Sequence, residues 1–213
     1  MRASAGRWVA VSGTATRALI VEAADELFYR HGYEHTSFAA IAGVVHISRG
    51  NFYYHFKSKD DILDAVIGAR IACTQQMLRR WEAEEAGPAD RICRFIEILL
   101  TNRADIQHYG CPVGALTTEL AKLEHSSLAQ ATGLFTLFRT WLREQFALLG
   151  YAAQADELAM RVLAVTQGVA TLANAFQDED FIRREVRHLT DWLRAYADGA
   201  GHGPRGKSGQ ADA

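Results

Sequence analysis

Residues 36–59 read TSFAAIAGVVHISRGNFYYHFKSK, which is the pattern of two short helices joined by a tight turn. Thr36 or Ser37 can cap the first helix, whose apolar residues fall on one face, and Ser48 can cap the second. The turn between the two helices falls at residues 45–47. This segment therefore predicts a helix-turn-helix.

The second of these helices opens with side chains that are suited to reading DNA. Arg49 matches the acceptor edge of guanine, Asn51 matches the edge of adenine, and Gly50 lets the backbone approach closely. The N-terminus of a helix also favours a phosphate group. Phe52 and Phe56, four residues apart, are expected to anchor the helix to the core. We therefore expect base contacts at the first turn of this helix.

Phosphate contacts are expected beside these base contacts. Tyr53 and Tyr54 offer hydroxyl groups, and Lys57 and Lys59 add positive charge close to the DNA backbone. Residues 1–60 hold seven Lys and Arg against five Asp and Glu, whereas the rest of the chain holds 16 against 20. Only the first quarter of the chain therefore has a charge that suits phosphate.

The composition of the whole chain is that of a helical globular protein. Its 213 residues are 49% hydrophobic and include only three prolines. Residues that favour helices are abundant, and apolar residues recur at helical spacing along the chain. We expect an all-α protein that is long enough to bury a substantial core.

The cysteines and the hydropathy pattern indicate the compartment. Cys73, Cys93 and Cys111 are an odd number of cysteines, without the spacing of a disulfide framework or of a C-x-x-C metal site. The sequence has no run of 18 apolar residues and no signal-peptide pattern. We expect a cytoplasmic protein that does not span a membrane and needs no metal or other cofactor.

Start and stop signals for helices recur along the chain. Thr16 and Gly32 are expected to bound the first helix. Ser58 and Asp61 form an S-x-x-D capping box in front of a long helix that should run to about Glu84. Further helix boundaries are expected at Pro88, Pro112 and Gly150.

The helix-turn-helix residues resemble the signature of the tetracycline-repressor-type (TetR) family of transcriptional regulators. The resemblance extends from Thr16 to Ile62. It rests on Thr36-Ser37, Ile41-Ala42, Ile47-Ser48-Arg49-Gly50, Tyr53, His55-Phe56 and Ser58-Lys59. It implies a homodimer that reads a palindromic double-stranded DNA operator with two recognition helices. It also implies a non-enzymatic repressor, whose C-terminal domain releases the DNA when a small-molecule effector binds.

The resemblance also implies roles for individual residues. Thr36 and Tyr53 match positions that usually hold phosphates, and Arg49 and Asn51 match positions that commonly contact bases. Lys59 begins the next helix beside the DNA backbone. The expected DNA-binding residues are Thr36, Ser37, Ser48, Arg49, Gly50, Asn51, Tyr53, Tyr54 and Lys59.

The turn departs from the family pattern. It usually reads Ala-Gly-Val, and this chain has Val45-His46-Ile47. Glycine tolerates a positive φ without strain, so His46 is expected to adopt the left-handed conformation, which is uncommon for histidine. We therefore expect a strained or slightly re-angled turn.

The last two predicted helices carry apolar residues at alternating steps of four and three, the spacing of a helix-packing seam. The earlier helix is apolar on more than one side, so its second face must be covered by a partner subunit or by the same chain. The residues expected at a dimer interface are Leu158, Val162, Val165, Val169, Leu172, Val186, Leu189 and Leu193.

An effector pocket is expected in the C-terminal part of the chain, which is rich in aromatic side chains. Gln167 and Asn174 are polar residues on an otherwise apolar helix, so we expect them to face a cavity. The candidate pocket residues are Phe95, Cys111, Phe138, Trp141, Gln167 and Asn174.

These predictions divide the chain into four parts. An N-terminal arm (1–13) precedes the helix-turn-helix domain (14–58), and a ligand-binding and dimerisation domain (59–198) precedes a disordered tail (199–213). The tail is expected because its residues are glycine-rich and scarcely hydrophobic.

Other interpretations of the cysteines and histidines stay open. Cys111 falls at an expected helix start, where the helix dipole lowers a thiol's pKa, so a thiol that senses oxidants or electrophiles is an alternative to a small buried residue. His108 lies near enough in sequence to suggest a thiol enzyme, but it has no third, orienting group. His31 and His35 do not share a helix face, because Gly32 ends the helix between them, so a metal site there is not expected.

Overall fold

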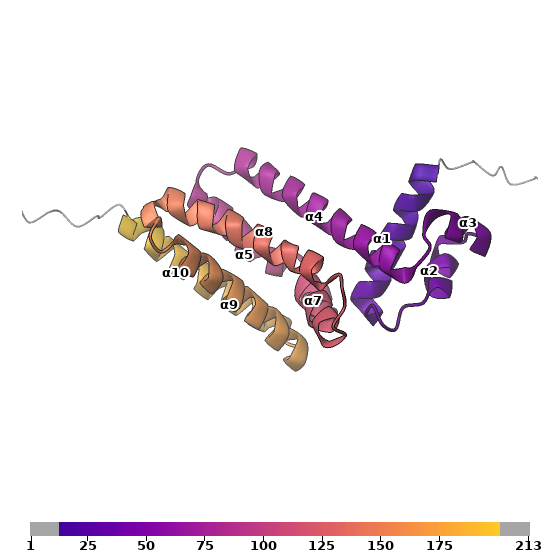
Figure 1. Cartoon of the computed structure of the whole chain (residues 1–213). Helices are drawn as coiled ribbons and strands as arrows, with labels where there is room; N and C mark the ends of the chain where they lie inside the picture. The colour runs from indigo at the N-terminus through magenta and orange to yellow at the C-terminus, as the bar shows by residue number, and fades with distance from the viewer. Residues whose placement is uncertain (1–12, 201–213) are drawn as a thin grey trace, which may run out of the picture. The chain divides into compact units, whose positions relative to one another are not determined.

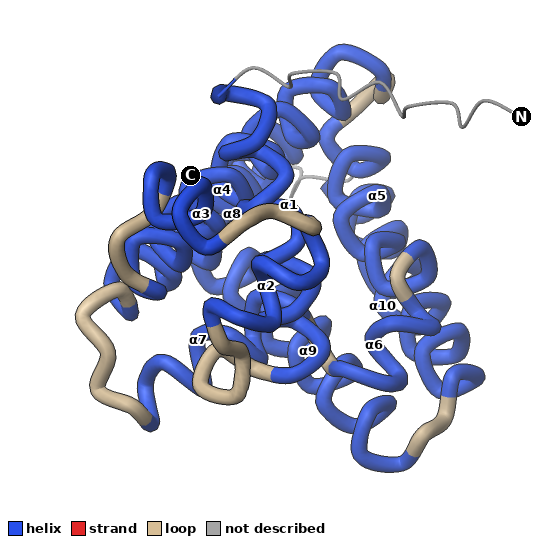
Figure 2. The backbone as a smooth tube through the Cα atoms, turned by 90° about the vertical axis from the view of Figure 1, so that its right-hand side faces the viewer, coloured by secondary structure: helices blue, strands red, loops and turns tan. Residues whose placement is uncertain are grey.

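The computed structural model describes residues 13–200, and helices are the only regular elements in that range (Figure 1, Figure 2). The prediction of an all-α protein is confirmed. The arm and the tail predicted at the two ends lie almost wholly outside the described residues. The elements are α1 (Gly13–His31), α2 (Phe38–Val45), α3 (Arg49–His55), α4 (Lys59–Glu84), α5 (Pro88–Thr101), α6 (Arg103–Tyr109), α7 (Pro112–Lys122), α8 (Leu128–Phe146), the π-helical turn η1 (Ala147–Tyr151), α9 (Ala155–Phe176) and α10 (Glu179–Ala200).

The described chain divides into two compact units. The first unit comprises the residues up to Ala72 together with Leu116–Ala131, and the second comprises Cys73–Ala115 and the residues from Thr132 onward. Residues 116–131 therefore fold with the helix-turn-helix, although their place in the sequence assigns them to the C-terminal domain. Long-range packing decides this division, and no local signal in the sequence announces it.

The first unit is built around a single apolar core. Ile20, Ala24 and Phe28 are spaced four apart on α1, so they share one buried face of that helix. Phe52 and Phe56 are only 1% and 2% exposed, which confirms them as the anchors of α3. The same core includes Ile41, Ile62, Leu63, Val66, Ile67, Leu116, Leu120 and Ala131.

Serine side chains cap the two short helices, as predicted. The hydroxyl of Ser37 accepts the backbone N–H of Ala40 at 3.2 Å, and the hydroxyl of Ser48 accepts that of Asn51 at 3.3 Å. Each cap satisfies a donor that would otherwise lack a partner inside its helix. The local sequence thus determines where α2 and α3 begin.

The capping box at the start of α4 is also confirmed. The Asp61 N–H donates to Ser58 Oγ, and the Asp61 carboxylate accepts the backbone N–H groups of Ser58 and Lys57, all at 3.0 Å. The bond from the Ser58 N–H, followed by that from Lys57, holds the pKa of the Asp61 carboxyl below its ordinary value.

One predicted helix boundary is wrong, and one helix was missed. α1 already begins at Gly13, so Thr16 lies buried within its first turn and does not cap it. α6 (Arg103–Tyr109) was not predicted, and its N-cap residue Asn102 makes no side-chain capping bond to the helix. The other end of α1 is as predicted, because Gly32 follows it with a φ of +84°.

The turn between α2 and α3 has the conformation expected for it. His46 has φ 55° and ψ 40°, which is left-handed, and its N–H donates to the carbonyl of Ala42 at the end of α2. A left-handed conformation costs about 1–2 kcal/mol for a residue with a Cβ atom, whereas glycine adopts it without this cost.

We expect His46→Gly to raise the free energy of unfolding by about 1 kcal/mol, because it removes this strain. Urea denaturation measures the change. Val44→Gly is the matched control, since Val44 is 54% exposed inside α2. A glycine there is expected to lower the stability by a similar amount. If His46→Gly and Val44→Gly both lowered the stability, the conformation of His46 would not be strained.

The second unit has its core around α9, which contacts α5, α6 and α10. Val162, Ala170 and Ala173 of α9 have no exposed surface, and Ile182 and Leu193 of α10 are equally buried. Among the described helices, α9 alone is long and apolar enough to cross a membrane by length and composition, a test that core helices of soluble proteins also pass.

Candidate nucleic-acid interface

α3 exposes one side of its first turns. Gly50 and Asn51 are exposed, as are Tyr53 (48%) and Tyr54 (76%). The side chain of Arg49, with which α3 begins, lies outside the described residues. The buried face of the helix holds its phenylalanines, so the polar side chain of Asn51 and most of Tyr54 stay exposed to solvent. This exposed surface is available to bind a ligand.

Aromatic contacts brace α2 against α3. The ring of Tyr53 stacks on that of Phe38 with centroids 5.5 Å apart and an interplanar angle of 16°, and Phe38 meets Phe52 edge-on at 5.0 Å. At the end of α3, Lys57 Nζ donates to the carbonyl of Tyr53 at 2.5 Å. Tyr53 is thus held in one direction while half of its surface stays exposed.

Thr36 is buried, whereas a side chain that contacts a phosphate must be exposed at the surface. Thr36 is only 3% exposed, and its hydroxyl donates to the carbonyl of Gly32 at 2.7 Å, with the carbonyl of Leu27 at 3.3 Å. These bonds join the end of α1 to the loop before α2. The structure therefore gives Thr36 a role in shaping that loop, and we leave it out of the proposed DNA contacts.

Lys59 is also occupied inside the first unit. Its Nζ donates to the carbonyls of Tyr33 at 2.9 Å and Glu34 at 3.2 Å, and it lies 4.2 Å from the centre of the Tyr33 ring. Two of the three N–H donors of this ammonium group are therefore used inside the first unit. Like Thr36, Lys59 holds the loop at residues 32–36.

Tyr33 joins this loop to residues 116–131. Its hydroxyl donates to the carboxylate of Asp60, and Nε2 of His125 lies 3.2 Å from the same oxygen. Nδ1 of His125 accepts the backbone N–H of Ser127 at 3.1 Å, so the neutral ring carries its proton on Nε2. Burial, and then the hydrogen bond to Asp60, raise the pKa of Tyr33. No sequence signal marks Tyr33 and His125 as partners, because they lie 92 residues apart.

Four of the six candidate pocket residues meet in two pairs. The rings of Phe95 and Phe138 pack edge-on with centroids 5.1 Å apart. Nε2 of Gln167 donates to Sγ of Cys111 at 3.4 Å. Gly114 permits the close approach at this second pair, because a Cβ atom there would lie 2.6 Å from Oε1 of Gln167. Gln167 is therefore held against Cys111 and Gly114, and the prediction that it faces a cavity stays a prediction.

The other two candidates use their polar atoms elsewhere. Trp141 donates its indole N–H to Oε1 of Glu82 at 2.8 Å, and Asn174 donates to the carbonyl of Gln107 at 2.9 Å. The polar atoms of Trp141 and Asn174 are therefore bonded outside the two pairs, and a shared effector pocket stays a prediction.

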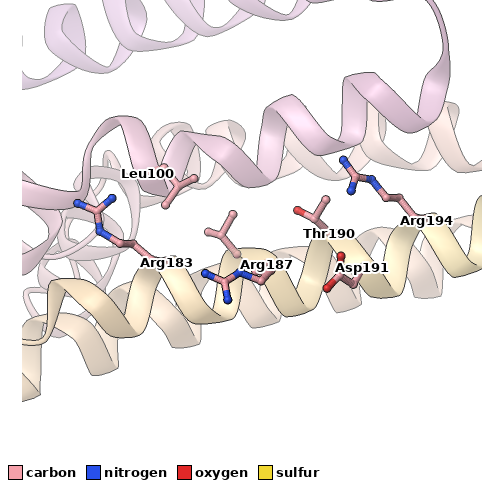
Figure 3. A pocket seen from close by; sticks show the side chains of 7 residues that line it. Leu100, Arg183, Arg187, Thr190, Asp191 and Arg194 are labelled. Carbon is pink, nitrogen blue, oxygen red and sulfur yellow. The ribbon is translucent and has the colours of Figure 1, made fainter.

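A pocket on the second unit is lined by other residues. Arginine side chains of α10 rise along it, with Leu100 of α5 opposite (Figure 3). Arg183 is already paired with Glu179 and Asp180. None of the six candidate effector residues lines it; the lining residues are Leu100, Arg183, Val186, Arg187, Thr190, Asp191 and Arg194.

The stripe expected at a dimer interface lies mostly in the chain's own core. Val165 is half-buried and Leu172 is 44% exposed. The other six are at most 6% exposed, because α9 and α10 use their seam to pack within the second unit; they are Leu158, Val162, Val169, Val186, Leu189 and Leu193. These six residues are therefore not available to a partner subunit.

Two family models match this chain. Residues 20–66, which include α2 and α3, match the bacterial regulatory proteins of the tetR family. Residues 88–188 match the C-terminal domain of LmrA/YxaF-like transcriptional regulators. The chain belongs to the TetR family of transcriptional regulators. This confirms the family suggested by the helix-turn-helix residues, and with it DNA binding in the control of transcription.

Individual relatives agree with this assignment. This TetR-family regulator is 28% identical over 167 residues to an HTH-type transcriptional regulator of Lactococcus lactis subsp. lactis, a match that covers 76% of this chain and 85% of the relative. It is 34% identical over 70 residues to the regulator TtgR of Pseudomonas putida, covering 33% of each chain. The crystal structure of a TetR regulator from Legionella pneumophila is 26% identical with a TM-score of 0.74, covering 87% of this chain and 98% of that chain.

Proposed function

We propose that this TetR-family regulator is a repressor that binds a palindromic operator as a homodimer and is released by a small-molecule effector. The observation that carries the proposal is the exposed first turn of α3. It offers a polar surface for base edges, while the opposite face is locked into the core by Phe52 and Phe56.

Within this proposal the residues of α3 have separate tasks. Asn51 reads a base edge, with Arg49 beside it, and Gly50 lets the backbone approach the DNA. Tyr53 and Tyr54 hold phosphates, and the helix N-terminus at Ser48 adds a favourable dipole. The exposed Ser37, at the N-terminus of α2, is a further phosphate contact.

An exposed apolar face of α9 supports dimerisation. Met160, Leu172 and Phe176 are 43%, 44% and 73% exposed, with Ala164 and Gly168 between them on the same side of the helix. Small residues let a second helix approach, and a contiguous patch of exposed apolar side chains commonly marks a protein–protein interface. We propose that a second copy of the chain covers this face. This exposed face, and not the buried stripe expected from the sequence, then forms the dimer interface. Sedimentation equilibrium is expected to give twice the mass of the chain, and the mass of one chain would contradict the proposal.

The effector is proposed to act by shifting a population. Dimers that can bind DNA are proposed to interconvert with dimers that cannot. An effector that binds the DNA-incompetent dimer better by about 1–3 kcal/mol weakens operator binding about 5–150-fold. The half-buried pair of Cys111 and Gln167 is the first place to test for effector contacts, because it combines polar atoms with an apolar surrounding.

A fluorescence anisotropy titration tests operator binding directly. The probe is a labelled duplex containing the palindrome upstream of the protein's own gene, with a scrambled duplex of equal length as control. Two half-sites one helical turn apart, about 34–36 Å, are expected from the two-fold symmetry. Affinity that falls with salt and prefers the palindrome is expected. Equal affinity for both duplexes would overturn the proposal.

A thiol switch at Cys111 is the second candidate for the signal. Sγ of Cys111 accepts the backbone N–H of Gly114 at 3.5 Å as well as the amide N–H of Gln167 at 3.4 Å, and the thiol is only partly buried, so a reagent can reach a sulfur atom that is held in one place. If this candidate is right, an electrophile such as N-ethylmaleimide releases the wild-type protein from DNA but leaves Cys111→Ser bound. Cys73→Ser, at an exposed cysteine, is the matched control and is expected to respond like wild type. Release that persists in Cys111→Ser excludes the thiol.

We propose a cytoplasmic protein without catalytic activity. His108, the candidate partner of Cys111 in an enzyme, instead places Nδ1 2.9 Å from the carbonyl of Ala104 in its own helix. A search for hydrolysis of model thioesters by the pure protein tests this, and turnover that depends on Cys111 would contradict it.

A further inference from the structure

A carboxylate from outside the helix-turn-helix holds the loop that leads into it. Glu119 of α7 accepts the backbone N–H of Tyr33 with Oε2 and that of Glu34 with Oε1, both at 2.9 Å. Hydrogen bonds to a charged acceptor are stronger than neutral ones, and two of them together fix an orientation. The first of these pairs spans 86 residues of sequence.

The loop is fitted to this carboxylate. Gly32 has a φ of +84°, and a Cβ atom there would lie only 3.0 Å from Oε1 of Glu119. On the other side of the chain, Lys59 donates to the carbonyls of Tyr33 and Glu34. The N–H groups of residues 33 and 34 are thus bound by an anion and their carbonyls by a cation.

The held loop leads directly into α2. The Thr36 N–H donates to the carbonyl of Tyr33 at 3.2 Å, and the Thr36 hydroxyl binds the carbonyl of Gly32. Ser37, the next residue, caps α2, and α2 packs on α3 through Phe38. The position of the loop therefore determines where α2 starts and how α3 is presented.

We infer that Glu119 is a positioning residue for DNA binding, which acts by holding the N–H groups of Tyr33 and Glu34. The inference rests on the proposed reading role of α3. Glu119 itself contacts no DNA. It sets the direction in which α3 meets the groove.

The substitution Glu119→Gln distinguishes the positioning role of this side chain from the effect of its negative charge, because the two change DNA affinity in opposite directions. Removing a negative charge from a DNA-binding unit strengthens binding through electrostatics alone. Glutamine keeps one acceptor oxygen but turns an NH₂ group toward the other N–H, so one bond to the loop is lost. We expect about tenfold weaker binding, the equivalent of one charge-assisted bond. Unchanged or tighter binding would overturn the inference.

The measurement is an anisotropy titration with a labelled duplex that the wild-type protein selects from a random-sequence pool. Glu144→Gln, at an exposed site on α8, makes the same charge change and is expected to bind within about twofold of wild type. Glu119→Asp keeps both oxygens and is expected to fall between wild type and Glu119→Gln. A stoichiometric titration gives the concentration of active dimer, and the affinity is calculated from that concentration. A partly unfolded sample is then not mistaken for a protein that binds weakly.

Two further readouts report on the loop itself. The amide protons of Tyr33 and Glu34 are expected to exchange faster in Glu119→Gln, while those of α9 keep their protection. Gly32→Ala is expected to weaken DNA binding less in a Glu119→Ala background than in wild type, because the new Cβ atom then meets no carboxylate. Strictly additive effects, or unchanged exchange at residues 33 and 34, would contradict the inference.

The outcomes separate the inference from the function on which it rests. If the wild-type protein selects no duplex, the reading role of α3 is wrong and the inference is overturned with it. If it selects one and Glu119→Gln binds that duplex like wild type, only the positioning role is wrong.

Discussion

Replacing Phe52 with alanine is expected to lower the free energy of unfolding of the first unit by about 3–5 kcal/mol. Phe52 is 1% exposed and packs edge-on against Phe38, so alanine leaves a cavity between α3 and the core. A domain's whole stability is about 5–15 kcal/mol, so this loss is a large share of it. DNA binding is expected to be lost as well, because α3 then has no fixed orientation.

Hydrogen exchange measured by mass spectrometry locates this loss. Protection is expected to fall in α1, α2 and α3 and to persist in α9 and α10. Tyr54→Ala is the control, because Tyr54 lies on the same helix but is 76% exposed. Its effect on stability is expected to stay within about 0.5 kcal/mol. If both variants were equally destabilised, Phe52 would not be the anchor of α3.

Asn51→Ala and Tyr53→Phe are expected to weaken DNA binding in two different ways. Asn51→Ala removes a base contact, so it relaxes the preference at one base pair by about 1–3 kcal/mol. Tyr53→Phe removes a hydroxyl that holds a phosphate but keeps the stacking on Phe38, so it weakens all sequences alike.

Anisotropy titrations against the selected duplex and its single-base-pair variants distinguish the two effects. At one position of the half-site, the Asn51→Ala variant is expected to bind duplexes with different base pairs with nearly equal affinity. The affinities of Tyr53→Phe are expected to shift in parallel, with a smaller dependence on salt. The same pattern of loss in both variants would contradict the separate roles.

Features that depend on neighbouring residues were predictable from the sequence. The caps at Ser37 and Ser48, the capping box of α4 and the left-handed His46 each depend on residues within one turn of chain. The anchors Phe52 and Phe56 follow from helical spacing in the same way. Local hydrogen bonding and periodicity act in this chain as they do in short peptides, so the sequence pattern was sufficient.

The roles of Thr36 and Lys59 could not be predicted in the same way. The resemblance to the TetR family implies a phosphate contact for Thr36 and a place beside the DNA backbone for Lys59. Their partners are carbonyl groups of residues 27–34, which the folding of the loop brings to them. The stripe on α9 was similarly ambiguous, because an apolar face packs equally well on its own chain or on a partner.

The sequence by itself determined that residues 36–59 form a helix-turn-helix with an exposed polar first turn on α3. It did so because capping, spacing and turn conformation are local properties. Only the tertiary structure decided that residues 116–131 belong to the same unit and that Glu119 holds the loop before α2. Backbone N–H groups are alike at every position, so their choice of a carboxylate 85 and 86 residues away is made by the packing of the core and not by any local pattern.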